Sequence, residues 1–361
     1  MNRRKVKEVC LRNGMKFGGN RIWVQSMLNR RSDDLQGNIQ QAIQLEKAGC
    51  DILRVAIPNF ESIRLIDGIK NAVDIPLVAD IHFNYKLALE AVAAGIDKIR
   101  INPGNIGDES RVREVALTCQ RANIPIRIGV NGGSLEKEIH QKYGGITPDA
   151  MVQSALYHVK LLEKFDFDDI VISLKSSDIV QTMQAYRLMA QKCDYPFHLG
   201  ITEAGTERMG LIRSTIGIGG LLAEGLGDTI RVSLTGEPLE EIYAGIDILK
   251  SLSLYPNTIT IVSCPTCGRT RIDLISLAKE IEEKTKNIQY PLKVAVMGCA
   301  VNGPGEAKDA DIGIAGGDGC GLLFKKGEII KKVEENQIIS ALVEEINKIV
   351  LEGNERIQDE K

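Results

Sequence analysis

The sequence has few aromatic residues, little net charge and no long apolar run. Aromatic side chains make up 4% of the 361 residues, and the formal net charge is -3. General nucleic-acid-binding proteins carry basic patches and aromatic stacking surfaces, so this class is disfavoured. No run of about 18 apolar residues is present, and the basic start MNRRKVKEVC is followed by no apolar core of a signal peptide. We therefore expect a cytoplasmic protein that is neither secreted nor inserted in a membrane.

Cysteine is also sparse, and one common glycine motif is missing. The eight cysteines are too scattered for a disulfide framework, which fits a reducing compartment. No GxGxxG fingerprint follows the first predicted strand, which argues against a dinucleotide-binding sheet. What remains is an ordinary globular composition, 43% hydrophobic and 26% charged, at a length that fits two domains.

Short β-branched runs alternate with helix-length segments over most of the chain. The helical segments, such as KLALEAVAAG, have apolar residues three and four apart. Strands that are nearly all apolar and separated by helices pair in parallel. Eight such units predict an α/β fold with a (β/α)8 barrel of the TIM type, and an open doubly wound sheet is the alternative. The predicted strands span residues 22–27, 52–57, 76–81, 98–102, 125–130, 169–175, 197–202 and 229–234.

The pattern changes after Leu254, and a smaller α/β domain is predicted to follow. Its strands are TITIVS, LKVAVMG, DIGIAGG and the turn around GLLFKKGEII, with helices near 271–285 and in QIISALVEEINKIVLEG. We therefore expect a barrel over residues 1–254 and a second domain over residues 258–361.

Polar residues stand at the carboxyl ends of the predicted barrel strands. In a (β/α)8 barrel this end holds the ligand. Arginine offers a planar fork of donors that matches phosphate oxygens, so several arginines and a lysine on different strands predict a cage for a phosphate ester. The alternative is that each arginine pairs with an acid to hold the barrel together. The candidates are Arg54, Asp80, His82, Arg100, Asn102, Arg127, Asn131, Lys175, Thr202, Glu203, Arg231 and Ser233.

Glu203 is the candidate proton donor or acceptor. It lies in GITEAGT directly after the seventh predicted strand, where a carboxylate beside a bound phosphate can carry a proton. It can equally serve as a capping acid for the next helix.

Three cysteines past the ends of second-domain strands predict a metal centre. Cys264 and Cys267 form a C-x-x-C pair, and Cys299 opens the run GCAVNGPGEA, in which Glu306 supplies a carboxylate. Structural zinc normally takes a second close pair of soft ligands, so this spacing favours an iron-sulfur cluster over zinc or buried thiols. Cys320, in GGDGCGLLF, is a rival to Glu306 for the fourth position.

Runs along nearly the whole chain resemble one known family, the 4-hydroxy-3-methylbut-2-enyl diphosphate synthases of the non-mevalonate isoprenoid pathway. The chain corresponds to the short, two-domain form of the family. It departs from the usual threonine-rich pattern in QSMLNRRSDD, after the first predicted strand. The matching runs are PLVADIHF, RINPGNIG, IPIRIGVNGGSLEK, FHLGITEAG, DTIRVSL, CPTCGRT and GCAVNGPGEA.

The resemblance implies a mechanism and partners. It implies a 4Fe-4S cluster on Cys264, Cys267, Cys299 and Glu306, with the carboxylate yielding its iron to substrate. The implied substrate is 2-C-methyl-D-erythritol 2,4-cyclodiphosphate. Two single-electron transfers open its ring and expel water, which gives 4-hydroxy-3-methylbut-2-enyl diphosphate. Flavodoxin or ferredoxin is the implied electron donor, and the implied assembly is a homodimer.

The resemblance also assigns roles to the predicted mouth residues. The diphosphate is expected among the arginines, the lysine, Asn131 and Ser233, with the carbon skeleton oriented by Asp80, His82 and Asn102 and Glu203 as the proton source. A zinc-stabilised barrel lyase or isomerase acting on a phosphate ester is the alternative function.

Overall fold

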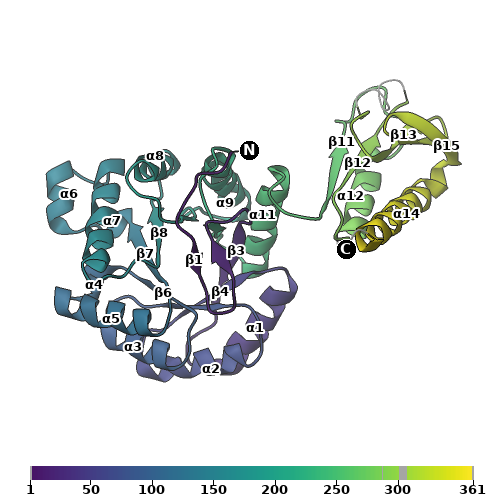
Figure 1. Ribbon diagram of the computed structural model, residues 1–361. Helices are drawn as coiled ribbons and strands as arrows, with labels where there is room; N and C mark the ends of the chain where they lie inside the picture. The colour runs from purple at the N-terminus through teal and green to yellow at the C-terminus, as the bar shows by residue number, and fades with distance from the viewer. Residues whose placement is uncertain (1, 287, 301–306, 360–361) are drawn as a thin grey trace. The chain divides into compact units, whose positions relative to one another are not determined.

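The structure is a computed structural model that describes residues 2–286, 288–300 and 307–359. The chain divides into two compact units, Met1–Leu254 and Tyr255–Lys361 (Figure 1). Each unit has its own sheet and its own core, so each is described separately.

The first unit is a parallel eight-stranded barrel, as predicted. The strand order is β8-β7-β6-β5-β4-β3-β10-β9. A parallel bridge between Ile172 and Phe197 joins the two ends of this order and closes the ring. The strands are β3 (Trp23–Met27), β4 (Ile52–Ala56), β5 (Leu77–Asp80), β6 (Lys98–Ile101), β7 (Ile126–Asn131), β8 (Ile170–Lys175), β9 (His198–Leu199) and β10 (Thr229–Ile230).

The last two barrel strands are shorter than predicted. The sequence predicts strands over residues 197–202 and 229–234, but regular strand pairing is confined to His198–Leu199 and Thr229–Ile230. Directly after β9, a Cβ at Gly200 would lie 2.6 Å from Lys175 Nζ and 2.8 Å from the Arg231 carbonyl oxygen. Close approach of a side chain and a neighbouring backbone at this point leaves room only for glycine.

Helices follow the strands and surround the barrel (Figure 1). Side chains that are short and polar cap several of them: Asp34, Asn84, Asp108 and Asp178 each accept a hydrogen bond from a backbone N–H of the first turn. The helices are α1 (Leu35–Lys47), α2 (Arg64–Lys70), α3 (Tyr85–Ala93), α4 (Pro103–Ile106), α5 (Glu109–Arg121), α6 (Lys137–Tyr143), α7 (Pro148–Glu163), α8 (Ile179–Ala190), α9 (Glu207–Ser214), α10 (Gly220–Ala223) and α11 (Pro238–Ser251), with a π-helical turn at Thr215–Gly219.

A short hairpin that the sequence patterns did not predict precedes the barrel. Its strands, β1 (Val9–Cys10) and β2 (Lys16–Phe17), pair antiparallel. Buried Phe17 and its hairpin neighbours pack against Ile52, Val78 and Val171, which lie at the amino ends of their strands. The hairpin therefore covers the end of the barrel opposite the predicted site.

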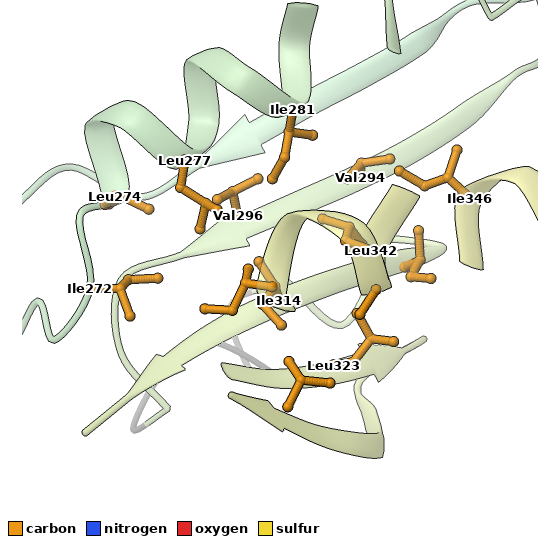
Figure 2. Packing of buried hydrophobic residues seen from close by; sticks show 14 of the residues in the cluster. Ile272, Leu274, Leu277, Ile281, Val294, Val296, Ile314, Leu323, Leu342 and Ile346 are labelled. Carbon is orange, nitrogen blue, oxygen red and sulfur yellow. The ribbon is translucent and has the colours of Figure 1, made fainter. Parts of the chain in front are cut away.

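The second unit is a five-stranded mixed sheet covered by two helices. The strand order is β11-β12-β13-β14-β15, in which the first three strands are parallel and the last two antiparallel. Figure 2 shows the core between the helices and one sheet face, where Leu277, Ile281, Val296 and Leu342 interdigitate. The elements are β11 (Ile259–Ser263), α12 (Leu274–Thr285), β12 (Leu292–Met297), β13 (Ile312–Gly317), β14 (Cys320–Lys325), β15 (Glu328–Glu334) and α14 (Ile338–Asp359).

Candidate active site

Neighbouring strands of the barrel place the predicted charged residues side by side. Asp80 pairs in register with Arg100, and Arg100 pairs with Arg127. Directly paired residues of parallel strands share one face of a sheet. Lys175 is the last residue of β8, and Arg231 directly follows β10. The structure thus gathers these side chains in the barrel interior, with Lys175 and Arg231 at its carboxyl end.

Asp80 is bound by three groups at the centre of this cluster. Its Oδ1 accepts a hydrogen bond from Arg100 Nη1 at 3.2 Å, and its Oδ2 lies 3.3 Å from His82 Nε2 and 3.8 Å from Arg54 Nε. Burial alone would raise the pKa of Asp80, but the Arg54 charge, the His82 hydrogen bond and the Arg100 charge outweigh it and hold the pKa far below its usual range. The arginine-acid pairing considered as an alternative is therefore real for Arg54 and Arg100, and Arg231 pairs in the same way with Glu241.

Even so, cations outnumber acids inside the barrel mouth. Arg127 is fully buried and donates from Nη1 to Gln25 Oε1 at 3.3 Å. Burial, and then the charge of Arg54, lowers the pKa of both Arg127 and Lys175. Burial likewise lowers the pKa of Arg54 to about 10. The predicted cations are Arg54, Arg100, Arg127, Lys175 and Arg231, and the buried acids beside them are Asp80 and Glu241. Such an excess of buried positive charge favours an anionic ligand.

The uncharged candidates lie around the same end of the barrel. Asn102 is buried directly after β6, and Asn131 is the last residue of β7. Thr202 and Ser233 are half-buried in the segments that follow β9 and β10. All four residues therefore follow or end a barrel strand, and their shared role in a ligand site stays a prediction.

Glu203 is exposed and has an unusual backbone conformation. Its φ of 54° lies in the left-handed region, which a non-glycine residue adopts at a cost of about 1 kcal/mol or more. The cap position of the next helix, α9, is occupied by Thr206, so Glu203 does not take the capping role that was its alternative. Backbone strain of this kind is frequent at functional sites, and here it occurs in the segment that follows a barrel strand.

Two of the predicted cluster cysteines lie just past the carboxyl ends of neighbouring strands in the second sheet. Cys264 directly follows β11 and Cys299 follows β12, and these strands are parallel neighbours with Ser263 opposite Val296. The backbone N–H of Gly298 donates to Cys264 Sγ at 3.2 Å. Hydrogen bonds of this kind stabilise thiolate sulfur in iron-sulfur sites.

Cys267 is exposed, and its pKa lies below the ordinary value of a thiol. A hydrogen bond from the Arg269 backbone is the main cause that lowers the pKa of Cys267, and Thr270 adds to it. The thiolate is the form that binds metal. The donor set therefore fits a soft metal centre, although no three His, Cys, Asp or Glu side chains within the described ranges are arranged as a finished metal site. Glu306 lies outside the described residues, so its predicted place as a ligand stays a prediction.

Cys320 lies at the same end of the sheet, where the parallel strands have their carboxyl ends. It is the first residue of β14 and pairs with Gly317, the last residue of β13. It is half-buried, and its Sγ would lie 2.8 Å from a Cβ at Gly317.

Models of two protein domains match this chain almost end to end. The GcpE TIM-barrel domain matches residues 7–246, and the GcpE protein C-terminal domain matches residues 260–348. The chain belongs to the GcpE family. The resemblance inferred from the sequence runs is thereby confirmed.

Curated relatives of this GcpE chain share more than half of its residues. One from Caldanaerobacter subterraneus is 56% identical over 350 residues, covering 97% of this chain and 99% of its own. One from Fusobacterium nucleatum is 54% identical over 358 residues, covering 99% of each chain. Both are named 4-hydroxy-3-methylbut-2-en-1-yl diphosphate synthase (flavodoxin). The solved 3-dehydroquinate dehydratase of Geobacillus kaustophilus, 13% identical with a TM-score of 0.50, covers 70% of this chain and 100% of its own, and shares the barrel fold alone.

The GcpE barrel also contains polar residues that sequence reasoning missed. Glu241, on α11, binds Arg231 from outside the strands. Lys98 and His198 are fully buried on β6 and β9, among otherwise apolar strand residues. The sequence could have indicated Lys98, because it stands two residues before Arg100, and residues two apart in a strand face the same side.

Among the described residues, no helix is long and apolar enough to span a lipid bilayer.

Proposed function

We propose that this chain catalyses the reductive ring opening and dehydroxylation of 2-C-methyl-D-erythritol 2,4-cyclodiphosphate to 4-hydroxy-3-methylbut-2-enyl diphosphate. Its near full-length relatives bear the name of that synthase. The observation that carries the proposal is the cluster of buried cations at the carboxyl end of the GcpE barrel, because a cyclic diphosphate needs such a cage.

In this proposal the diphosphate binds among residues of five strands or their ends. The arginines supply planar forks of donors, and Lys175 supplies a point charge. Asp80 keeps Arg54 and Arg100 in place through its contacts of 3.8 and 3.2 Å. The proposed diphosphate ligands are Arg54, Arg100, Arg127, Asn131, Lys175, Arg231 and Ser233, and the proposed contacts to the carbon skeleton are Asp80, His82, Asn102 and Thr202.

Cys264, Cys267 and Cys299 would hold a 4Fe-4S cluster, and Glu306 would complete its ligand set. When bound, such a cluster supplies single electrons and a Lewis-acidic iron. The Gly298 N–H holds the Cys264 sulfur in position for this role. A carboxylate is a harder and more easily displaced ligand than a thiolate, which is the chemical reason for glutamate at the fourth position.

Glu203 would carry the proton that the departing hydroxyl needs to leave as water. Its exposure and its position in the segment that follows β9, outside the cap position of α9, support this role. Flavodoxin, which the relatives' protein name includes, is the proposed electron donor, with ferredoxin as a substitute. A homodimer in the cytoplasm is the proposed assembly and location.

An anaerobic iron and sulfide count with an ultraviolet-visible spectrum tests the cofactor, and turnover of the cyclic diphosphate with reduced flavodoxin tests the reaction. We expect four irons and four sulfides per chain, as a 4Fe-4S cluster requires. A colourless protein that contains zinc would instead support the barrel lyase or isomerase. Glu306→Ala should lose turnover while Cys320→Ala keeps it, and the reverse result would move the fourth ligand to Cys320.

A further inference from the structure

Lys98 is a buried amine beneath the proposed diphosphate cage. It is the first residue of β6, it is 0% exposed, and it faces the barrel interior on the same side as Arg100. Its Nζ lies 4.3 Å from the centroid of the Phe17 ring, on the hairpin that covers the amino end of the barrel. Within the described residues no hydrogen-bond acceptor reaches Nζ.

The charges around Lys98 are mostly of its own sign. Burial, followed by the charges of Arg127 and Arg54, lowers the pKa of Lys98 well below its usual value. Asp80, a buried acid of the same barrel interior, is already engaged with Arg54, Arg100 and His82. Two other titratable groups stand on barrel strands: Lys175 on β8, and His198 on β9, whose Nδ1 lies 2.8 Å from Thr229 Oγ1 and whose pKa is lowered by burial, with help from the Lys98 charge. The hairpin carries the Glu8–Lys16 pair, and Asp97, the residue before Lys98, binds Lys70.

A buried ammonium with no acceptor costs several kcal/mol, so a lysine in this place sheds its proton instead. A diphosphate adds two or more negative charges to the cage above Lys98. That change of local charge favours the ammonium form. The proton comes from solvent, and the reaction is the simple protonation of an amine.

We propose that Lys98 is a positioning residue of the anion cage, uncharged before the diphosphate binds and protonated when a diphosphate binds to Arg100 and Arg127. The proposal rests on the proposed function, because it takes the cage as the diphosphate site. Lys98 does not touch the ligand. It acts through the cage arginines, by adding positive charge beneath them at the moment when the ligand's negative charge arrives.

The test is calorimetric titration of the full-length protein with inorganic pyrophosphate, in buffers of equal pH and different ionisation enthalpy. The dependence of the measured heat on the buffer gives the number of protons taken up per pyrophosphate bound. Lys175, whose pKa burial also lowers, contributes to the uptake of the wild type. The share of Lys98 is therefore the difference between the wild type and Lys98→Met.

We expect Lys98→Met to lose a large part of one proton from the uptake and to bind pyrophosphate about tenfold more weakly near neutral pH. Because a bound proton is gained on binding, wild-type affinity falls as pH rises, by about tenfold per pH unit where one full proton is taken up. Lys98→Arg, which stays charged, should restore affinity without restoring the uptake. Lys70→Met, which removes a lysine that pairs with Asp97 outside the barrel, is the matched control and should leave the uptake unchanged.

Unchanged proton uptake in a folded Lys98→Met protein would overturn the proposal. If that variant does not fold, Lys98→Gln takes its place. The proposal is also overturned if the wild-type protein takes up no proton on binding, after the protons that pyrophosphate itself gains or loses are subtracted. Absence of pyrophosphate binding by the wild type would count against the anion cage, and so against the proposed function. Normal binding with unchanged uptake would count against the role of Lys98 alone.

Discussion

Both carboxylate oxygens of Glu241 lie 3.1 Å from a single atom of Arg231, the Nη2 nitrogen. Oε1 of the same carboxylate also accepts a hydrogen bond from the backbone N–H of Leu234 at 3.0 Å. Glu241 is buried on α11, so the helix sets the direction of an arginine that follows β10. Arg231 is thus held as a preorganised donor rather than left as a flexible surface cation.

We expect Glu241→Gln to weaken diphosphate binding about tenfold, because a charge-assisted hydrogen bond contributes roughly 1.5–3 kcal/mol and its loss frees Arg231 to rotate. The Michaelis constant should rise while the turnover number changes little, and the cluster spectrum should stay the same. Glu240→Gln, at an exposed neighbouring position, is the control. Equal or tighter binding by Glu241→Gln would show that Glu241 only offsets positive charge.

The charged candidates of the site were predictable because they interrupt apolar strands. Arg100 and Asn102, for example, stand two apart at the end of a nearly continuous β-branched run, and such a pattern has few structural explanations. Glu241 was not predictable in the same way. It lies on an amphipathic helix whose other acids, Glu240 and Asp247, are exposed, and only the packed structure shows which carboxylate turns inward.

The fold was predictable to a similar degree. The eight apolar runs predicted the eight barrel strands, because a parallel strand that is buried on both faces reads as a nearly continuous apolar run. The hairpin β1–β2 gave no signal, because each of its strands has two residues and its stability comes from contacts of Phe17 with the distant residues Ile52, Val78 and Val171. Such long-range contacts leave no periodicity in the local sequence.

Asp80→Asn should destabilise the barrel by about 3 kcal/mol at neutral pH, because it leaves buried arginines without their counter-charge. The folded-state pKa of Asp80 is depressed, so its contribution is present above the unfolded carboxyl pKa of about 4 and is lost as pH falls below that value. Denaturant unfolding at several pH values checks this. The difference between wild type and variant should shrink in acid. Asp33→Asn, which removes an exposed partner of Arg31, should change stability little at any pH.

Chemical labelling should separate the cluster cysteines from the buried ones. In protein stripped of metal, iodoacetamide should modify exposed Cys267 readily and leave Cys50 and Cys119 unmodified, since these are buried and burial raises the pKa of each to about 12. Reconstitution with iron and sulfide should protect Cys267 while exposed Cys10 still reacts. Mass spectrometry of the peptides gives the result. Equal labelling of Cys267 before and after reconstitution would remove it from the ligand set.

Phe17→Ala should destabilise the first unit by about 3–5 kcal/mol, because it deletes a fully buried ring and leaves a cavity between the hairpin and the amino end of the barrel. The loss should exceed that of Phe17→Leu, which keeps most of the apolar volume. Thermal and denaturant unfolding measure both variants.

Phe17 has a second consequence, through Lys98. Its ring lies 4.3 Å below Nζ and excludes water from the amine. Removing the ring lets water reach Lys98, which raises the pKa of this lysine toward its ordinary value and keeps the amine protonated before any ligand binds. Phe17→Ala should therefore take up fewer protons on binding pyrophosphate than the wild type does, although Lys98 itself is unchanged. A variant that loses stability but keeps the full uptake would show that the hairpin supports the barrel without controlling the charge of its interior.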